Sequence, residues 1–206
     1  MIDSLKKMPE DKAEIEAVRQ ERRLTTIRSI KSKSSTHDFW RDMAGDVKDD
    51  LWLERTKAAV GLVPEGRHVV DIGCGDMKVE RFLPSSCRYT PLDIAQRDDR
   101  TIVVDLNRER LPKIDANFFV CLGVLEYLHD IPKVLRQLSR QFSDGLVSYH
   151  PLERSPARDR LAVGWVNALN STELTALFKA AGFRNVEVIE YKPSLHFYRL
   201  NKPMKS

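Results

Sequence analysis

The chain has few cysteines, no long apolar run and little excess of charge, and each absence excludes a class of protein. Among its 206 residues only Cys74, Cys87 and Cys121 are cysteines. An odd number without CxxC spacing, in a chain without a secretory leader, supports neither a disulfide scaffold nor a cysteine zinc site. We therefore expect no metal and a reducing, cytoplasmic setting. The apolar runs are too short to cross a bilayer.

Charge is nearly balanced over most of the chain. The sequence has 34 Lys and Arg against 30 Asp and Glu, a net charge of +4 and a pI near 9.0. Proteins dedicated to binding nucleic acid carry a larger net positive charge. This sequence also has no evident cluster of aromatic and basic residues on which bases could stack. We therefore do not expect nucleic acid as the partner. The length and the 42% apolar content suit one compact domain with a sizeable core.

Residues 1–35 are predicted to form a basic leader. They hold nine Lys and Arg against six Asp and Glu, whereas the rest of the chain has 25 against 24. Helix formers dominate from Glu10 to Ile30 with only a thin apolar stripe, and KSKSS then resembles a linker. The prediction is a helical or flexible leader that is solvated, docks a partner or membrane surface, or dimerises. The folded domain would span residues 36–206.

The remainder alternates apolar strands with helices. One or two helices are predicted over residues 36–63, interrupted at Gly45, with Phe39 and Trp40 either in the core or in a lid. Strands are predicted at HVVDIG, RYTPLDI, TIVVDL, NFFVCLG and GLVSYH, with a final pair at NVEVIEY and LHFYRLN. Helices are predicted at MKVERFL, LHDIPKVLRQLSRQF and STELTALFKAAGF, the last with a Ser/Thr N-cap and Gly182 at its end. This alternation favours parallel βαβ units.

A glycine turn follows the first strand of the domain. Gly73 and Gly75 allow the backbone to pass close under a ligand, and the next helix offers unpaired N–H groups. Asp93 ends the following strand 20 positions after Gly73, the spacing at which a carboxylate reaches ribose hydroxyls in doubly wound sheets. A dinucleotide fingerprint would have a third glycine where this chain has Lys78. The pattern therefore favours adenosine without a diphosphate.

Five segments in order, VVDIGCGDM, PLDI, VVDLNRERLP, CLGVLEYLHD and ELTALFKAAGF, resemble the class I S-adenosylmethionine-dependent methyltransferases. The resemblance covers residues 36–200 and is closest to small bacterial enzymes with a methyltransferase-11-like pattern. It implies an α/β, doubly wound, Rossmann-like sheet of seven strands. That sheet would be mostly parallel with an antiparallel last strand, and helices would cover both faces.

The resemblance also implies a set of residues that bind S-adenosylmethionine and its product S-adenosylhomocysteine. Asp93 would bind the ribose hydroxyls with Ile94 against the adenine, and Asp105 would contact the adenine amino group. The full set is Asp71, Gly73, Cys74, Gly75, Asp93, Ile94, Asp105, Leu106, Cys121 and Leu122. Met77 departs from the family pattern, which has a third small residue there. We expect a displaced loop at this position.

The catalytic candidates follow from the chemistry of methyl transfer. The sulfonium supplies an activated methyl group, so the protein must align a nucleophile and take up its proton when needed. His150, at the end of GLVSYH, is the first candidate base, and Glu126 and His129 are less favoured ones. Tyr149 and Tyr127 could orient either the substrate or the cofactor. Each has an alternative, since a loop, capping or core role also fits. Trp165 and Asn167 would line the acceptor pocket or pack in the core.

A basic set, Arg154, Arg158 and Arg160, either recognises an anionic substrate such as an acidic sugar or forms a solvated insertion. The predicted function is transfer of a methyl group to an oxygen or nitrogen of a small molecule or glycan. One alternative is a catalytically silent S-adenosylmethionine-binding scaffold. The other is a nicotinamide-dependent oxidoreductase, for which Tyr198 and Lys202 have a Tyr-x-x-x-Lys spacing on a strand and tail, not on a helix.

Overall fold

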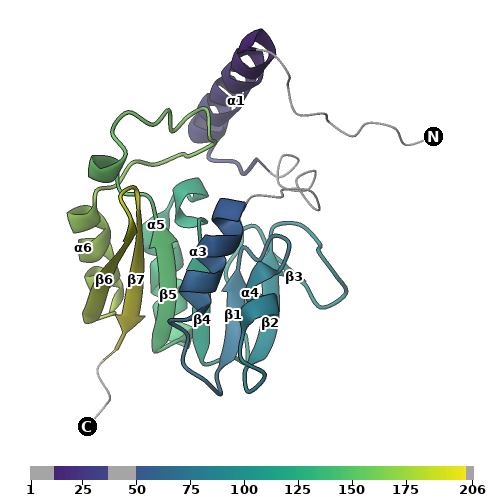
Figure 1. Ribbon diagram of the computed structural model, residues 1–206, viewed down its shortest axis with the longest axis vertical. Coiled ribbons are helices and arrows are strands. Elements are labelled where there is room, and N and C mark those ends of the chain that lie inside the picture. The colour runs from purple at the N-terminus through teal and green to yellow at the C-terminus, as the bar shows by residue number, and fades with distance from the viewer. Residues whose placement is uncertain (1–11, 37–49, 203–206) are drawn as a thin grey trace.

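The computed structural model describes residues 12–36 and 50–202, which form a seven-stranded sheet with helices on both faces (Figure 1). The strand order is β3-β2-β1-β4-β5-β7-β6. The strands are β1 (His68–Ile72), β2 (Arg88–Asp93), β3 (Ile102–Val103), β4 (Phe118–Leu122), β5 (Asp144–Tyr149), β6 (Asn185–Lys192) and β7 (Leu195–Asn201). All neighbours pair in parallel except β7, which is antiparallel to both β5 and β6. This topology confirms the predicted fold class.

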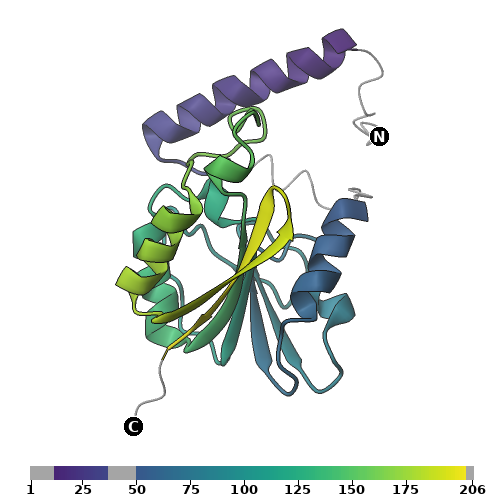
Figure 2. The same ribbon diagram turned by 60° about the vertical axis from the view of Figure 1, so that its left-hand side comes forward.

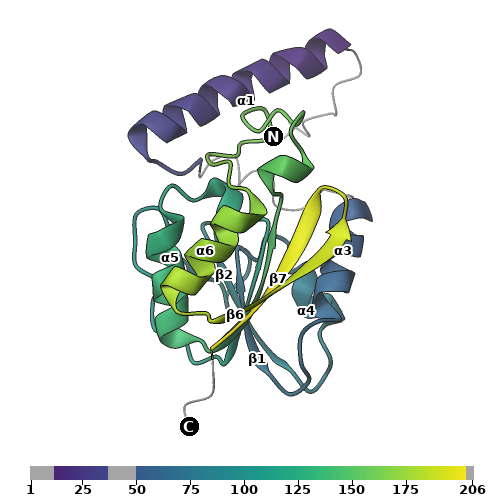
Figure 3. The same ribbon diagram turned by 90° about the vertical axis from the view of Figure 1, so that its left-hand side faces the viewer.

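Two apolar cores lie on the two faces of the sheet. The helices are α1 (Lys12–Ser32), α3 (Asp50–Val60), α4 (Lys78–Phe82), α5 (Ile131–Gln141) and α6 (Ser171–Ala181), with the short 3-10 helices η1 (Leu125–Tyr127) and η2 (Leu152–Arg154). Helices α3 and α4 cover one face, and α5 and α6 cover the other (Figure 3). The central strands are buried on both faces, as the uninterrupted apolar run of β4 predicts. A Cβ atom on Gly145 of β5 would lie 2.1 Å from the ring of Phe119, so the sheet packs tightly there.

Local sequence signals explain the start of α5 and both ends of α6. The side chain of Asp130 caps α5 by accepting from the backbone N–H of Lys133. As predicted, helix α6 ends at Gly182, whose φ of 111° lies in the left-handed region. Its N-cap is Asn170, which forms a capping box with Glu173, so the predicted Ser/Thr cap was wrong by one residue.

Two predicted elements differ from the structure or lie outside it. The strand predicted at TIVVDL shrinks to the two residues of β3, at the edge of the sheet. The region 36–63 contributes α3 to the described residues. Phe39, Trp40 and Gly45 lie outside the described residues.

Helix α1 lies across the end of the sheet where the parallel strands have their carboxyl termini (Figure 2). It contacts the loop between β5 and α6 through Thr26, whose hydroxyl lies 2.9 Å from the carbonyl of Leu161, and through an Arg23–Asp159 ion pair of 2.6 Å. Ser29 also lies 3.2 Å from Nε2 of His129. The helix thus forms a roof above the carboxyl ends. None of the helices described is long and apolar enough to cross a membrane.

Candidate active site

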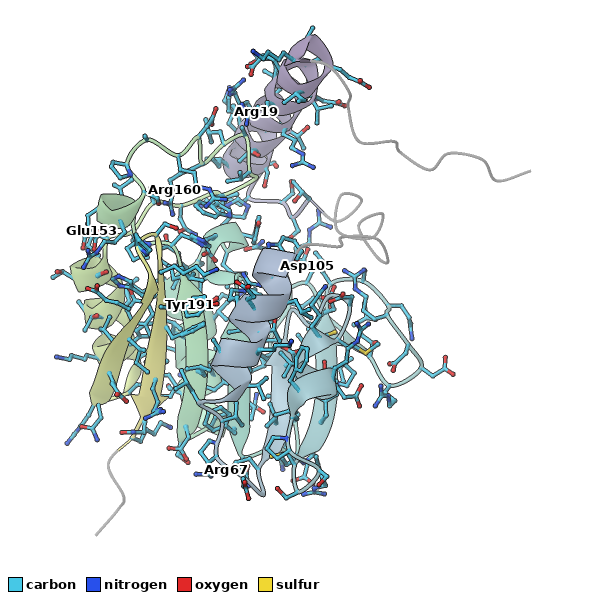
Figure 4. All side chains as sticks on the ribbon, in the orientation of Figure 1. Arg19, Arg67, Asp105, Glu153, Arg160 and Tyr191 are labelled. Carbon is cyan, nitrogen blue, oxygen red and sulfur yellow. The ribbon has the colours of Figure 1, made fainter. Side chains whose placement is uncertain are left out.

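A cavity of about 540 Å³ opens at the carboxyl ends of the parallel strands, beneath α1. Residues from the glycine turn, from the ends of β2 and β4, from α3 and from the β5–α6 loop line it. Figure 4 shows Asp105, Tyr191 and Arg160 at this end of the sheet, whereas Arg67 lies at the opposite end. In doubly wound sheets ligands bind at the carboxyl ends of the strands, so this cavity is the candidate site.

The glycine turn brings bare backbone to the cavity. Gly73 and Gly75 have φ values of 73° and 52°, in the left-handed region that favours glycine. A Cβ atom on Gly73 would lie 2.4 Å from Cγ2 of Val124, whereas one on Gly75 would meet nothing within 4 Å. The backbone at Gly75 therefore borders open space. Met77 is left-handed too, with φ 58°, but its sulfur lies 3.9 Å from Arg100 and its side chain does not line the cavity.

Asp93 anchors this turn from the next strand. Its Oδ2 accepts the N–H of Gly75 at 2.8 Å, and its Oδ1 accepts the N–H of Ala95 and a guanidinium N–H of Arg97, both at 3.0 Å. A carboxylate has about four acceptor positions, so one remains on Oδ2. Since Asp93 lines the cavity, that position is available to a hydroxyl group of a ligand.

Asp71 lies below the turn at the end of β1 and is 2% exposed. Burial raises the pKa of its carboxyl group to about 7, although a hydrogen bond from the hydroxyl of Tyr89, at 2.8 Å, opposes the rise. A cation placed in the cavity would favour the ionised form of this group. Asp71 is therefore suited to face a ligand that carries a positive charge.

Ser35, in the segment that follows α1, contacts Asp105, the residue predicted to bind the adenine amino group. Ser35 donates its hydroxyl to Oδ1 of Asp105 at 2.6 Å, and Asn107 donates a side-chain N–H to Ser35 at 2.8 Å.

Nine of the ten predicted cofactor residues line the cavity. The exception is Cys121 in β4, which is 1% exposed and whose thiol has a pKa raised by burial. It contributes to the core beneath the cavity.

A buried carboxylate and an imidazole meet on the other side of the cavity. Glu126 of η1 is fully buried, and its Oε1 accepts the backbone N–H of His150 at 3.1 Å and lies 3.2 Å from Nδ1 of the same residue. Oε2 has no hydrogen-bond partner among residues 12–36 and 50–202. Both residues line the cavity. The sequence prediction thus named two side chains, 24 positions apart, that the fold brings into contact.

Tyr149 lies behind this pair and does not line the cavity. Its hydroxyl donates to Oδ1 of Asn167 at 2.6 Å and accepts the N–H of Leu169 and a guanidinium N–H of Arg160. It therefore holds the β5–α6 loop against the sheet. His129 likewise does not line the cavity; its ring contacts Ser29 and the carbonyl of Ser34.

Trp165 connects the β5–α6 loop to the imidazole. Its ring centroid lies 4.8 Å from that of His150, and its Nε1 donates to the hydroxyl of Tyr127 at 3.2 Å. The guanidinium of Arg158 lies 4.8 Å above the same indole. Trp165 is thus both packed in the core and part of the cavity lining, so the two roles considered from the sequence are combined.

The predicted basic set separates into three different environments. Arg154 forms an ion pair with Glu190 on the surface, and Arg160 donates to the carbonyls of Asn167 and His150. Only Arg158 lines the cavity. Sequence reasoning missed three other arginines in the lining, because none belongs to a motif: Arg22 of α1, Arg55 of α3 and Arg97, which follows β2.

No three His, Cys, Asp or Glu side chains in the described ranges are grouped so that they could hold a metal ion. The sequence matches a family described as a methyltransferase domain over residues 39–188. The chain belongs to this methyltransferase family. It is therefore an S-adenosylmethionine-dependent methyltransferase, and its cofactor is S-adenosylmethionine. A comparison with curated proteins found no match.

Three solved structures illustrate the likeness of the fold. A candidate O-methyltransferase from Nostoc punctiforme PCC 73102 superposes with a TM-score of 0.67 at 13% identity, covering 88% of this chain and 69% of that one. A methyltransferase from Thermotoga maritima gives 0.57 at 14% identity, with coverages of 74% and 89%. CalO1, a methyltransferase of calicheamicin biosynthesis with bound S-adenosylhomocysteine, gives 0.60 at 19%, with coverages of 74% and 54%. The matched part thus spans about half of CalO1.

The residues at the glycine turn fit the cofactor. The backbone at Gly75 borders open space, Asp93 keeps one acceptor position for a ribose hydroxyl, and Asp71 offers a carboxylate to a positive charge. Met77, the departure from the family pattern, does not occupy the cavity. These observations favour a working cofactor site over a blocked one.

Proposed function

We propose that this methyltransferase transfers a methyl group to an oxygen or nitrogen atom of a small molecule or glycan, with His150 as the general base. The observation that carries the proposal is the contact between Nδ1 of His150 and the buried carboxylate of Glu126. A carboxylate on Nδ1 fixes the orientation of the ring and leaves Nε2 for the acceptor. In the part of the chain that the structure describes, Nε2 of His150 has no hydrogen-bond partner.

When bound, S-adenosylmethionine supplies the activated methyl group, so the protein needs to orient the acceptor and remove one proton. In this proposal Nε2 of His150 takes the proton from the attacking hydroxyl or amine. Glu126, which is fully buried, stabilises the imidazolium that results. Tyr149 acts as a positioning residue, since its hydroxyl holds the loop that carries Trp165.

We propose the cofactor contacts as predicted, with two refinements. Asp93 would bind the ribose through Oδ2, and Asp71 would face the amino group of the methionine moiety. Asp105, Leu106 and Ile94 would surround the adenine. Cys121 would act only through packing, because it is buried beneath the cavity lining.

The structural neighbours give limited support for the acceptor class. CalO1 belongs to calicheamicin biosynthesis, and a human neighbour is an N-acetylserotonin methyltransferase, so both names refer to small molecules. Identities of 19% and 16% carry only the fold, so the acceptor rests on the chemistry of the cavity. The leader over residues 1–35, the domain over 36–206 and a cytoplasmic location stay predictions.

The test separates cofactor binding from catalysis. Titration calorimetry with S-adenosylhomocysteine measures the first, and formation of that product from S-adenosylmethionine across a panel of hydroxyl and amine acceptors measures the second. We expect His150→Gln to keep the affinity and lose turnover. His68→Gln, at the start of β1 beside Thr90, is the matched control and should change neither. Equal turnover in wild type and His150→Gln would contradict the proposal.

A further inference from the structure

The segment after α1 is held in place by hydrogen bonds, although its sequence, KSKSS, resembles a linker. The hydroxyl of Ser29 donates to the carbonyl of Ser34 at 2.5 Å, and Nε2 of His129 lies 3.2 Å from the same carbonyl. The backbone N–H of Ser34 in turn donates to the carbonyl of Ser29 at 3.3 Å. These bonds bring the next residue, Ser35, to a defined position in the lining of the cavity.

Asn107 fixes the direction of the hydroxyl group of Ser35. Its Oδ1 accepts the backbone N–H of His129 at 2.9 Å, so its amide nitrogen faces the other way. That nitrogen donates to Oγ of Ser35 at 2.8 Å and to the carbonyl of Tyr127 at 3.0 Å. A hydroxyl that accepts one hydrogen bond still has a proton to donate, and Ser35 donates it to Oδ1 of Asp105 at 2.6 Å.

Asp105 keeps its second oxygen for another donor. Oδ1 accepts from Ser35 and from the backbone N–H of Asn107, the latter at 3.0 Å. Oδ2 lies 3.8 Å from Nε of Arg108, which is too far for a hydrogen bond, and it accepts none from residues 12–36 and 50–202. Asp105 lines the cavity. Ser35 thus occupies one oxygen and leaves the other available to a ligand.

Asp105 also lies close to the carboxylate that we assign to the ribose. The backbone N–H of Val104 donates to the backbone carbonyl of Asp93 at 2.9 Å, and the side chains of Asp93 and Asp105 line the same cavity. In the cofactor the adenine is attached directly to the ribose. Its 6-amino group is a hydrogen-bond donor, and a carboxylate is the stronger kind of acceptor for it.

We propose that Ser35 is a positioning residue for the recognition of adenine: its hydroxyl orients Asp105 so that Oδ2 accepts the 6-amino group. Ser35 lies in the predicted leader, so the leader contributes to the cofactor site and to the choice of adenine over other purines. This inference rests on the proposed function, because it extends the contact between Asp105 and the adenine.

The same hydrogen bond couples the roof to the cofactor. A cofactor that holds Asp105 in the orientation that Ser35 requires also favours the docked position of α1, because coupling between two binding events is reciprocal. We expect S-adenosylhomocysteine to slow hydrogen exchange of residues 12–32 in wild type, and to slow it less in Ser35→Ala. Equal slowing in both proteins would contradict this coupling.

The main test compares two ligands by titration calorimetry. One is S-adenosylhomocysteine, and the other is its 6-deamino analogue, in which a hydrogen atom replaces the amino group. We expect wild type to bind S-adenosylhomocysteine at least about tenfold more tightly than the analogue. In Ser35→Ala the Kd of S-adenosylhomocysteine should rise about fivefold, whereas the Kd of the analogue should stay within about twofold. A loss confined to the ligand with the amino group is not expected of a merely structural residue.

Two further variants serve as controls. Ser34→Ala removes the same group one residue earlier; among the described residues that hydroxyl binds only the hydroxyl of Ser32, and Ser34 does not line the cavity. Both affinities should match wild type. Asp105→Ala should abolish the preference for the amino group. Adding Ser35→Ala to it should then change the preference no further, because Ser35 acts through Asp105.

The possible outcomes are distinguishable. Equal affinity of wild type for the two ligands would overturn the adenine contact and this inference with it. A preference that is unchanged in Ser35→Ala, or reduced as much in Ser34→Ala, would overturn the inference alone. An equal loss for both ligands in Ser35→Ala would also overturn it, since Ser35 would then serve only to hold the segment. The role of His150 is tested separately, by turnover.

Discussion

Oε1 of Glu126 contacts His150 twice, at the backbone N–H and at Nδ1 of the ring, with distances of 3.1 and 3.2 Å. The two residues come from neighbouring elements, since η1 follows β4 and His150 follows β5, and β4 pairs with β5 in parallel. One carboxylate oxygen therefore fixes both the end of a strand and the orientation of its imidazole. The second oxygen, Oε2, is buried without a hydrogen-bond partner among the described residues.

Glu126→Gln tests whether the charge of this carboxylate matters or only its shape. Glutamine can still accept the backbone N–H of His150, but it cannot stabilise an imidazolium by charge. We expect kcat to fall about 100-fold, while the Kd of S-adenosylhomocysteine stays within about twofold of wild type. The measurement is initial rates on an acceptor from the screen, with calorimetry alongside. Unchanged kcat would show that Glu126 serves only to hold the loop.

Asp93→Asn should weaken the cofactor site without removing the side chain. The amide keeps one acceptor oxygen but places an N–H group where the other oxygen accepts, either from Gly75 or from Ala95 and Arg97. We expect the Kd of S-adenosylhomocysteine to rise at least about tenfold by calorimetry. Asp98→Asn is the control, because Asp98 binds Arg100 outside the cavity lining. Equal affinities in the two variants would remove Asp93 from the site.

The pKa of Asp71 gives a prediction about stability and pH. Burial raises this pKa to about 7 in the folded protein, whereas an unfolded chain ionises near an ordinary value of about 3.9. Between these values the folded state keeps a proton that the unfolded state has released, so this contribution to stability is lost as the pH rises from about 4 to 7.

Asp71→Asn removes that dependence while keeping an acceptor for the hydroxyl of Tyr89. We compare the free energy of unfolding of the variant with that of wild type at each pH. This difference, variant minus wild type, should increase by about 1–3 kcal/mol from pH 4.5 to pH 8. Denaturant titration at both pH values measures this difference. Asp115→Asn, at an exposed position before β4, should show none. A difference that does not change with pH would contradict the buried carboxyl group as its source.

The fold was predictable because its signals are local. Apolar runs predict the buried strands, Gly182 predicts the end of α6, and Gly73 and Gly75 predict a turn that only glycine adopts easily. The spacing between Gly73 and Asp93 predicted that both belong to one ligand site, and both line the cavity. Such signals need only a few consecutive residues, so a single sequence can carry them.

The arginines of the cavity lining were less predictable, because they come from distant segments. Arg22, Arg55 and Arg158 occupy a helix, another helix and a loop, and no spacing connects them. Tyr149 was predicted as a catalytic candidate because it adjoins His150 in sequence. Successive side chains of a strand point to opposite faces, and Tyr149 binds Asn167 instead of lining the cavity. A tyrosine at the end of a strand fits a catalytic role and a role in holding a loop equally well, so the sequence alone does not distinguish them.

The docking of α1 could not be read from apolar periodicity, because polar contacts hold it. Ile15, Val18, Leu24 and Ile30 are all exposed, and the two buried side chains of the helix are Thr26 and Ser29. Three polar links to the domain therefore replace an apolar face. Hydrogen bonds of this kind contribute only about 1 kcal/mol each, so single substitutions should loosen the roof measurably.

Thr26→Ala is expected to loosen α1 in this way. The hydroxyl of Thr26 reaches the carbonyl of Leu161, whereas its neighbour Thr25 is exposed. Thr25→Ala is therefore a matched control with the same change in helix propensity. Hydrogen exchange followed by mass spectrometry should show about fivefold faster exchange for peptides of residues 12–32 in Thr26→Ala only. The β5–α6 loop around Leu161 should exchange faster in the same variant, because the contact is shared. Equal exchange in both variants would mean that the Arg23–Asp159 ion pair alone fixes the helix over the cavity.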